Sequence, residues 1–323
     1  MSCYNNPIFL GRNRLKTVIG VDLGGTNIVS AVVDEKGKVI GKDKRPTQAA
    51  LGAVGVMNRI VDSIHAASEN SGLPWKSHLG VGIGSPGPLN PKTGVILYTP
   101  NLNWKNVHLT GYLSRKTAKK VVLENDANLA ALGETWIGAG RGEKFVLCVT
   151  LGTGVGGGFI IDGKFYEGAW GVSNHIGHVV VDPKGPKAPY GNRGILEQYV
   201  SATGIVRLAT LAGLKPAPGE KLEAYTFQKM AERGNAKARA VYQQAGSMLG
   251  VGLTSAIHLL NPGIIIFAGG VSAAGDLLMK PMHRELKARC FASHLKGLKF
   301  KMAKLGDNMG VVGAARLAWQ SRR

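Results

Sequence analysis

A glycine-rich turn between two apolar segments occurs twice in this chain, and this repeat limits the possible folds more than any other feature. The turns are Asp22-Leu-Gly-Gly-Thr26 and Leu151-Gly-Thr-Gly-Val-Gly-Gly-Gly158. The flanking apolar segments are Thr17–Val21 and Ile28–Val33 in the first copy, and Phe145–Thr150 and Phe159–Ile161 in the second. In both copies eleven positions separate the leucine of the turn (Leu23, Leu151) from an aspartate in the next turn (Asp34, Asp162). We therefore predict two related halves, each opening with a β-hairpin.

Strand and helix patterns alternate in the remainder of each half. Further strands are predicted at Lys38–Gly41, Leu79–Ile83, Lys120–Leu123, Lys164–Tyr166 and Ile264–Ala268. Helices are predicted at Ala50–Asn70, Ala127–Ile137, Ala238–Leu260 and Gly310–Ser321. Alternation of this kind is typical of α/β layers.

Length and composition exclude several classes of protein. A chain of 323 residues is long enough for two domains, and 44% apolar residues are too many for a disordered chain. No apolar run is long enough to cross a membrane, and the first 16 residues do not resemble a secretory signal. The three cysteines, Cys3, Cys148 and Cys290, have no paired spacing. We therefore expect a cytoplasmic protein without disulfide bonds.

The charge is unusual, because 40 Lys and Arg residues against 20 Asp and Glu give a formal net charge of +20. Such a charge is often found in nucleic-acid-binding proteins. The basic residues are scattered, however, with local groups only at Arg12–Lys16, Lys42–Arg45, Arg115–Lys120 and Lys296–Lys304. None of these groups resembles a recognition helix or an RNA-binding surface. We attribute the charge to solubility and to attraction for anionic small ligands, and keep nucleic-acid binding as an alternative.

The two glycine-rich turns are candidates for phosphate binding. Backbone N–H groups of a tight glycine turn form a concavity for anions, and the missing side chains allow close approach. The alternative is that they are ordinary hairpin turns, but two copies favour a binding role. Asp22 would supply an oxygen to a magnesium–phosphate complex, or would only cap its turn. Neither turn matches the P-loop pattern Gly-x4-Gly-Lys-Ser/Thr.

Asp126 lies between a predicted strand and the start of a predicted helix. An aspartate in this place is often a helix N-cap. In a phosphoryl-transfer site it would instead accept the proton of the attacking hydroxyl. The neighbouring Asn125 both donates and accepts hydrogen bonds, which suits a polyol ligand.

His175-Ile-Gly-His178, with Glu197 nineteen residues after His178, has two interpretations. Two histidines and a carboxylate are possible metal ligands. No helical pattern aligns them and no fourth ligand is evident, so contacts to sugar hydroxyls are favoured.

Together these motifs resemble the ROK family of sugar kinases and repressors, which includes bacterial glucokinases. The resemblance runs from about Thr17 to Ala318 and follows the family's order and spacing. It is carried by Asp22–Thr26, Gly84-Ser-Pro-Gly-Pro88, Thr99-Pro-Asn-Leu102, Glu124-Asn-Asp-Ala-Asn128, Leu151–Gly158, Ile176-Gly-His178, Gly191-Asn-Arg-Gly-Ile-Leu-Glu197 and Phe267-Ala-Gly-Gly-Val271.

The resemblance implies an actin-like ATPase (ribonuclease H-like) α/β fold with a sugar and ATP cleft between two domains. We expect a small domain over residues 1–124, with the C-terminal helix 310–323 packing back on it, and a large domain over 125–309. Asp126 would be the catalytic base, and Asp22 would hold Mg²⁺ through water. The sugar ligands would be Ser85, Asn101, Asn125, Asp126, His175, His178 and Glu197. The ATP ligands would be Asp22, Gly24, Gly25, Thr26, Gly152, Thr153, Gly154, Gly269 and Gly270.

This chain departs from the family pattern at two places. Most members have Gly-Glu where this chain has Asn174-His175. Many members also hold a structural zinc ion with three cysteines, whose positions here are Ala188, Tyr190 and Ile195. We therefore expect no zinc site, and the effect of His175 on sugar choice is left open.

We predict an ATP- and Mg²⁺-dependent hexose kinase that converts glucose to glucose 6-phosphate. The alternatives are a kinase for another hexose, such as an N-acetylated or amino sugar, and a non-catalytic sugar-sensing member of the family. A polyphosphate donor is a further alternative to ATP. We expect a homodimer or homotetramer that contacts no membrane.

Overall fold

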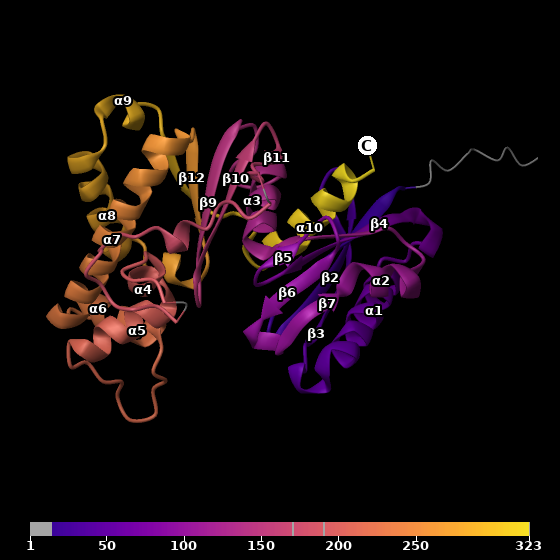
Figure 1. The fold of residues 1–323 in the computed structure, drawn as a ribbon, viewed down its shortest axis with the longest axis horizontal. Coiled ribbons are helices and arrows are strands. Elements are labelled where there is room, and N and C mark those ends of the chain that lie inside the picture. The colour runs from indigo at the N-terminus through magenta and orange to yellow at the C-terminus, as the bar shows by residue number, and fades with distance from the viewer. Residues whose placement is uncertain (1–14, 170, 190, 323) are drawn as a thin grey trace, which may run out of the picture.

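Two mixed β-sheets with the same strand order form the framework of this computed structural model, which describes residues 15–169, 171–189 and 191–322 (Figure 1). The first sheet has the order β3-β2-β1-β4-β8 and the second the order β11-β10-β9-β12-β13. The first contains β1 (Thr17–Leu23), β2 (Asn27–Asp34), β3 (Val39–Pro46), β4 (His78–Ser85) and β8 (Val121–Asn125). The second contains β9 (Phe145–Leu151), β10 (Val155–Ile161), β11 (Lys164–Phe165), β12 (Ile264–Ala268) and β13 (Lys299–Met302).

The strand pairing confirms the repeat expected from the sequence. In each sheet the first three strands along the chain pair antiparallel, and the next two strands are added parallel to the first. The hairpins β1–β2 and β9–β10 are therefore equivalent, and their turns lie at the carboxyl ends of β1 and β9.

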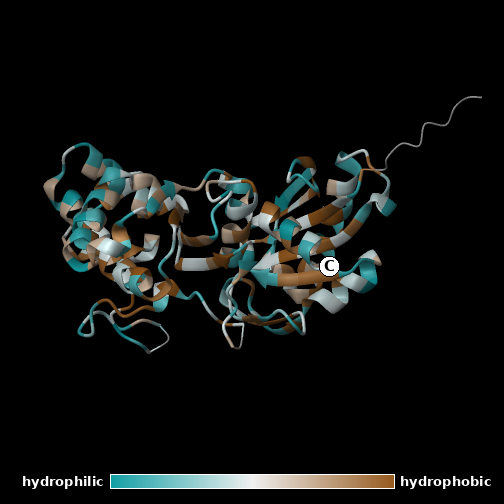
Figure 2. Ribbon diagram, turned by 90° about the horizontal axis from the view of Figure 1, so that it is seen from above, coloured by the Kyte–Doolittle hydropathy of each residue, from teal (hydrophilic) through white to brown (hydrophobic). Residues whose placement is uncertain are grey.

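Helices cover the two sheets and bury four apolar clusters among the described residues. Apolar residues lie mainly on the strands and on the helix faces that cover them (Figure 2). The first sheet carries α1 (Gly52–Asn70) and α2 (Leu109–Thr117), and a small sheet of β5 (Leu89–Asn90), β6 (Val95–Thr99) and β7 (Trp104–His108) lies beside it. The second body contains α4 (Glu197–Val200), α5 (Ala202–Leu211), α6 (Ala224–Glu232), α7 (Ala236–Leu260), α8 (Asp276–Arg289) and α9 (Ala292–Leu295). Short 3₁₀ turns lie at Ala49–Leu51, Trp75–Ser77, Pro100–Leu102, Ile176–His178, Gly270–Ala274 and Gly306–Asn308. None of the helices in the described part of the chain is long and apolar enough to span a bilayer.

Two helices, α3 (Asp126–Trp136) and α10 (Met309–Gln320), pack against each other between the two sheets (Figure 1). Glycines allow this close approach. A Cβ on Gly20 of β1 would lie 1.9 Å from the carbonyl oxygen of Val311, and one on Gly313 would lie 1.8 Å from that of Leu129. The C-terminal helix packs on β1, β4 and α3. The domain boundary near residue 124 stays a prediction.

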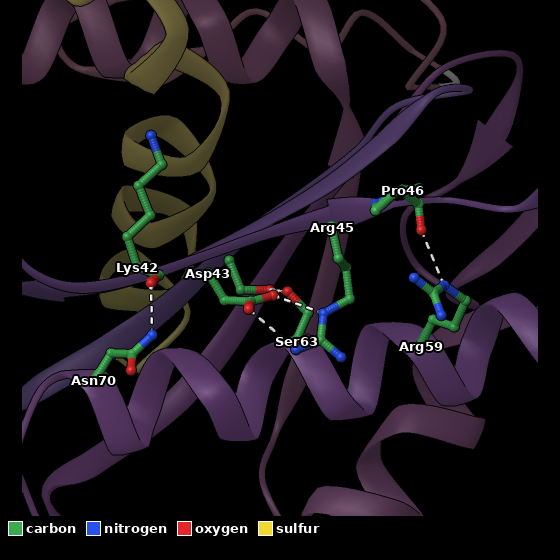
Figure 3. A network of polar contacts seen from close by, with 8 residues as sticks. Lys42, Asp43, Arg45, Pro46, Arg59, Ser63 and Asn70 are labelled. Carbon is green, nitrogen blue, oxygen red and sulfur yellow. Dashed lines mark hydrogen bonds and ion pairs between the residues drawn. The ribbon is translucent and has the colours of Figure 1, made fainter.

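A polar network fixes α1 along the edge strand β3 (Figure 3). Asn70 and Arg59 of α1 donate hydrogen bonds to the carbonyl oxygens of Lys42 and Pro46, each at 2.9 Å. Arg45 Nε donates to the Asp43 carboxylate at 2.7 Å. Desolvation alone would raise the pKa of Asp43, but hydrogen bonds from Arg45 and Ser63 hold it below its usual value. Side chains of α1 thus bind carbonyl oxygens of the edge strand β3, which another strand could otherwise pair with.

The second glycine-rich turn is shorter than the sequence analysis predicted. Gly156, Gly157 and Gly158 belong to β10 and not to the turn. A Cβ on Gly156 would lie 2.7 Å from Ala127 Cβ, and one on Gly158 would lie 2.5 Å from Ala131 Cβ. These glycines are needed because α3 packs directly on the strand. Only Gly152, Thr153 and Gly154 connect the two strands.

Candidate active site

The first group of predicted residues lies where three parallel strands end. In the register of β1, β4 and β8, Asp22 pairs with Gly84, and Gly84 pairs with Glu124. One position further, Ser85 pairs with Asn125, and Asp126 begins α3 directly afterwards. The sheet therefore brings together residues that are about 40 and 60 positions apart in the sequence. Their place at the carboxyl edge of a parallel sheet is where α/β proteins bind ligands.

The two carboxylates Asp22 and Asp126 influence each other. Burial, together with the nearby charge of Asp126, raises the pKa of Asp22 to about 6. Burial also raises the pKa of Asp126, although hydrogen bonds from the backbone N–H of Ala127 and the side chain of Asn125 favour its ionised form. A carboxylate with a raised pKa is a more effective proton acceptor near neutral pH. The pair is therefore suited to acid–base chemistry.

The Asp22 carboxylate also fits a magnesium ion. Among the described residues no hydrogen bond neutralises this buried carboxylate, so a cation or its water ligands could pair with it. Mg²⁺ is commonly held by one or two carboxylates, with waters and substrate phosphates completing its shell. A cation beside Asp22 and Asp126 would also relieve the repulsion between them. Within the described residues no group of three or more His, Cys, Asp and Glu side chains is placed to hold a metal by itself.

The N-terminus of α3 orients the polar side chains around Asp126. Asn125 is the N-cap, and its Oδ1 accepts hydrogen bonds from the N–H groups of Ala127 at 3.0 Å and Asn128 at 3.4 Å. Glu124 accepts a hydrogen bond from Asn128 Nδ2 at 3.0 Å. Burial raises the pKa of Glu124, whereas the hydrogen bonds that it accepts from Asn128 Nδ2 and from the N–H of Asn125 act to lower it. The helix N-terminus thus presents amide groups and partial positive charge to a ligand.

A small polar pocket opens beside this helix N-terminus. Of the predicted sugar ligands, Asn125 and His175 line it. Four further polar residues of the pocket were missed as ligands in the sequence analysis, namely Glu124, Asn128, Ser173 and Asn174. Asn128 follows Asn125 by three positions on a helix, so its place on the same face could have been predicted from spacing. A pocket with several amide groups can satisfy a polyhydroxylated ligand.

The second glycine-rich turn lies beside Gly269 and Glu197. A Cβ on Gly269 would lie 2.4 Å from the carbonyl oxygen of Leu151, and a φ of 87° also favours glycine there. Glu197 Oε2 accepts a hydrogen bond from the N–H of Val155 at 2.9 Å. A Cβ on Gly152 or on Gly270 would meet nothing within 4 Å, so both have open space above them. The turn and Gly269–Gly270 thus form one surface that an anionic or flat ligand can approach closely.

The segments that carry His178 and Glu197 run side by side in a short antiparallel pairing. Val180 bridges Ile195, and the N–H of Leu196 donates to the carbonyl oxygen of Val179 at 2.9 Å. The His175 ring lies edge-on to that of His178, with ring centroids 6.0 Å apart. Burial, with the nearby His178, lowers the pKa of His175. His175 is thus held in the neutral form at pH 7, in which it offers one donor and one acceptor.

The remaining predicted residues lie around the first turn. A Cβ on Gly25 would lie 3.1 Å from Asn101 Cβ, so Asn101 packs beside Gly24, Gly25 and Thr26. Ser85 is fully buried, and its hydroxyl donates to the carbonyl oxygen of Pro86 at 3.2 Å. In this conformation Ser85 faces the protein interior, unlike Asn125 and His175.

The segment 180–195, where many ROK proteins carry zinc-binding cysteines, does not fit zinc in this chain. Ala188 and Ile195 are buried apolar residues, and Tyr190 lies outside the described residues. Backbone hydrogen bonds hold the segment, among them Ala188 N–H to Asn192 O and Val181 N–H to Gly194 O, both 2.8 Å. Ala188 and Ile195 therefore offer no side-chain ligand to a metal, and the absence of zinc stays a prediction.

The chain has the actin-like ATPase fold, which consists of two α/β bodies of equal topology. Each body has a glycine-rich turn at the carboxyl edge of its sheet, and the carboxylates and the polar pocket lie between the bodies. The ROK family model matches residues 18–321, and the chain belongs to the ROK family.

Known proteins similar to this chain include enzymes and regulators. A glucokinase of Thermotoga maritima is 36% identical over 93% of this chain and 96% of its own length. A ROK glucokinase of Streptomyces griseus, solved in complex with glucose and AMPPNP, is 34% identical with a TM-score of 0.78, over 94% of this chain and 99% of that one. A xylose repressor of Caldicellulosiruptor bescii is 27% identical over 95% of this chain and 79% of its own length. The protein is a sugar kinase of the hexose-kinase group.

Proposed function

We propose that the protein transfers the γ-phosphoryl group of ATP to the 6-hydroxyl of glucose. The observation that carries this proposal is Asp126, a carboxylate of raised pKa at the N-terminus of α3, between Asp22 and the polar pocket. The glucokinase relative and the glucose–AMPPNP complex of the S. griseus protein support glucose and ATP as the substrates.

In this mechanism the sugar is held by amide and imidazole groups of the pocket. Asn125, Asn128 and His175 offer donors and acceptors to its hydroxyls. We assign the remaining sugar hydroxyls to His178, Glu197 and Asn101, as the resemblance to the family implies. Exact positioning of the attacking hydroxyl is the main contribution, because phosphoryl transfer needs in-line geometry more than covalent help.

Asp126 accepts the proton of the 6-hydroxyl as its oxygen attacks the γ-phosphorus. The new bond joins this oxygen to phosphorus, the bond between phosphorus and the β,γ-bridging oxygen breaks, and ADP leaves with that electron pair. The N–H groups of the turns at Gly24–Gly25 and Gly152–Gly154 hold the phosphates, and Gly269–Gly270 lies beside the nucleoside. Mg²⁺, held through water by Asp22, would neutralise charge on the phosphates when bound. Closure of the two bodies excludes water and so suppresses ATP hydrolysis.

The test is an ADP-release assay with ATP over a panel of glucose, mannose, glucosamine, N-acetylglucosamine and N-acetylmannosamine. The highest kcat/KM is expected for glucose, with 6-phosphorylated product by NMR. A higher value for an amino or N-acetylated sugar would favour the second candidate, a kinase for another hexose. His175 in the pocket is the observation that keeps this candidate open. Release of ADP with none of the sugars would favour a sugar-sensing role. Measuring sugar 6-phosphate formation with polyphosphate in place of ATP tests the donor.

A further inference from the structure

A second, larger groove lies outside the site described above, between residues 182–186, Arg193 and the helices α5 and α7. Its volume is about 770 Å³. This lies within the range of roughly 300–1,000 Å³ typical of small-molecule sites. None of the residues that line it lines the pocket at Asn125 and His175. The groove is therefore a separate candidate for ligand binding.

The groove carries a strong excess of positive charge. Four cationic side chains line it, namely Lys184, Arg193, Arg207 and Lys237. Across the described ranges, none of the four forms an ion pair with a carboxylate. The single carboxylate of the lining, Asp182, already accepts hydrogen bonds from Tyr199 Oη at 2.9 Å and from the N–H of Lys184 at 3.0 Å. Charge complementarity therefore selects an anion.

Arg207 is the most constrained of the four cations. Its guanidinium lies over the Tyr199 ring, 5.8 Å from the centroid, and Nη2 donates to the carbonyl oxygen of Gln198 at 3.0 Å. Its Nε–H is buried and has no acceptor in the segments that the structure describes. A buried donor without a partner is unfavourable. These contacts hold the planar guanidinium in one place at the groove, and such a group is well suited to recognise a phosphate.

Part of the remaining lining is apolar. Leu208 and Val241 contribute to it from buried positions, and Leu211 is 73% exposed. A purely inorganic anion would leave this surface in contact with water. The lining thus suits a ligand with an anionic head and an apolar body.

We propose that this groove binds an organic phosphate monoester, with the phosphate at the cations and the apolar part over Leu208 and Leu211. The groove shares no lining residue with the polar pocket. It is, however, joined to the phosphoryl-transfer site through α4, because Glu197 contacts the second glycine-rich turn while Gln198 and Tyr199 contact Arg207.

The test is isothermal titration calorimetry at constant ionic strength with phenyl phosphate, inorganic phosphate and phenol. Saturating glucose and AMPPNP are present, so that the phosphate-binding turns are occupied. We expect one phenyl phosphate per chain, bound at least fivefold more tightly than inorganic phosphate, and no binding of phenol. Equal affinity for phenyl phosphate and inorganic phosphate would overturn the role of the apolar lining.

Variants locate the binding. Lys184→Ala with Lys237→Ala removes two exposed cations of the groove, and at least tenfold weaker binding of phenyl phosphate is expected. Arg207→Met should abolish binding, and Arg207→Lys should weaken it. The matched control, Lys144→Ala with Lys164→Ala, removes the same charge from exposed positions outside the groove lining. An equal loss in the control would show diffuse attraction to a basic protein and overturn the proposal, as would no binding to the unaltered chain. If glucose and AMPPNP fail to bind, the proposed function fails, while the groove variants still report on this site.

Discussion

The Asp22 carboxylate lies directly over the α-carbon of Gly310, in the first turn of α10. A Cβ on Gly310 would lie 2.5 Å from Asp22 Oδ2 and 2.7 Å from its Cγ. The C-terminal helix therefore leaves room for the Asp22 side chain only because this position is glycine. A helix that is nearly 290 residues away in sequence thus fixes a residue of the proposed phosphate site.

Gly310→Ala is expected to displace the Asp22 carboxylate. Since a shift of about 1 Å can cost roughly 100-fold in rate, we expect a 10- to 100-fold lower kcat/KM for Mg-ATP. The matched control is Gly111→Ala in α2, where the nearest atom to the new Cβ is Arg115 Nη1 at 3.8 Å. Steady-state kinetics of both variants, with thermal melting to show that both fold, is the measurement. Equal kcat/KM in the two variants would contradict the role of Gly310.

Asp126→Asn is expected to lower kcat by roughly 10²- to 10⁴-fold, with a smaller change in sugar affinity, because the amide cannot accept the proton. The same change removes the charge that contributes to the raised pKa of Asp22, so this pKa should fall below about 6. Kinetics tests the first effect, and NMR titration of the Asp22 carboxyl tests the second. Near wild-type turnover would reduce Asp126 to a helix residue without a catalytic role.

Local patterns predicted most of the framework. The repeated hairpins, the helices α1, α3, α7 and α10, and the strand β12 lie within a few residues of their predicted places. These elements were predictable because their apolar spacing and turn residues are local signals. The elements that were not predicted are the short strands β5–β7 and β13 and the helices α2, α4, α5, α6, α8 and α9. Among them α5 and α6 are strongly amphipathic, so their apolar spacing could have indicated them.

Non-local packing explains what the sequence analysis could not predict. Gly156–Gly158 were interpreted as a turn, because a glycine in a sequence can mark either a turn or a close packing contact. Only the contact with α3 shows that these glycines serve close packing. The proximity of Asp22 to Asp126 likewise depends on β4 lying between β1 and β8. The pocket residues Glu124 and Asn174 were missed as ligands because their roles arise from the contacts around Asn128.

The purified protein is expected to contain far less than one zinc ion per chain, because Ala188 and Ile195 offer no ligand atoms. Chelators should leave its melting temperature unchanged. Elemental analysis and thermal melting with and without EDTA are the measurements. A stoichiometric amount of zinc, lost together with stability in EDTA, would show that another set of ligands has replaced the cysteines.

His175→Glu is expected to change sugar preference, because it restores a carboxylate in the pocket. A carboxylate accepts two hydrogen bonds from adjacent hydroxyls, whereas a neutral imidazole accepts one. Each buried hydrogen bond gained or lost is worth about 1 kcal/mol, or roughly fivefold in affinity. We expect stronger discrimination of glucose from 2-deoxyglucose and mannose in the variant. In the unaltered protein the sugar KM should change below about pH 6.5, the usual pKa of histidine, because the pKa of His175 is lowered. If neither the preference nor the pH profile moves, His175 does not contact the sugar.

Acid is expected to destabilise the protein through His78. This residue is fully buried, with Nδ1 2.7 Å from Thr17 Oγ1 and Nε2 2.7 Å from Ser68 Oγ. Burial, and the nearby charge of Lys119, lower its pKa to about 4, from 6.5 in an unfolded chain. Between these two values the unfolded state binds more protons than the folded state, so stability falls as the pH falls from 6.5 to 4, by about 3 kcal/mol for this group.

Urea unfolding from pH 7.5 to 4.5 measures the effect. His78→Asn should be less stable at pH 7.5 but should lose less on acidification. The control variant His108→Gln, at an exposed position, should keep the full dependence of the free energy of unfolding on pH. An unchanged slope in His78→Asn would assign the acid sensitivity to other groups.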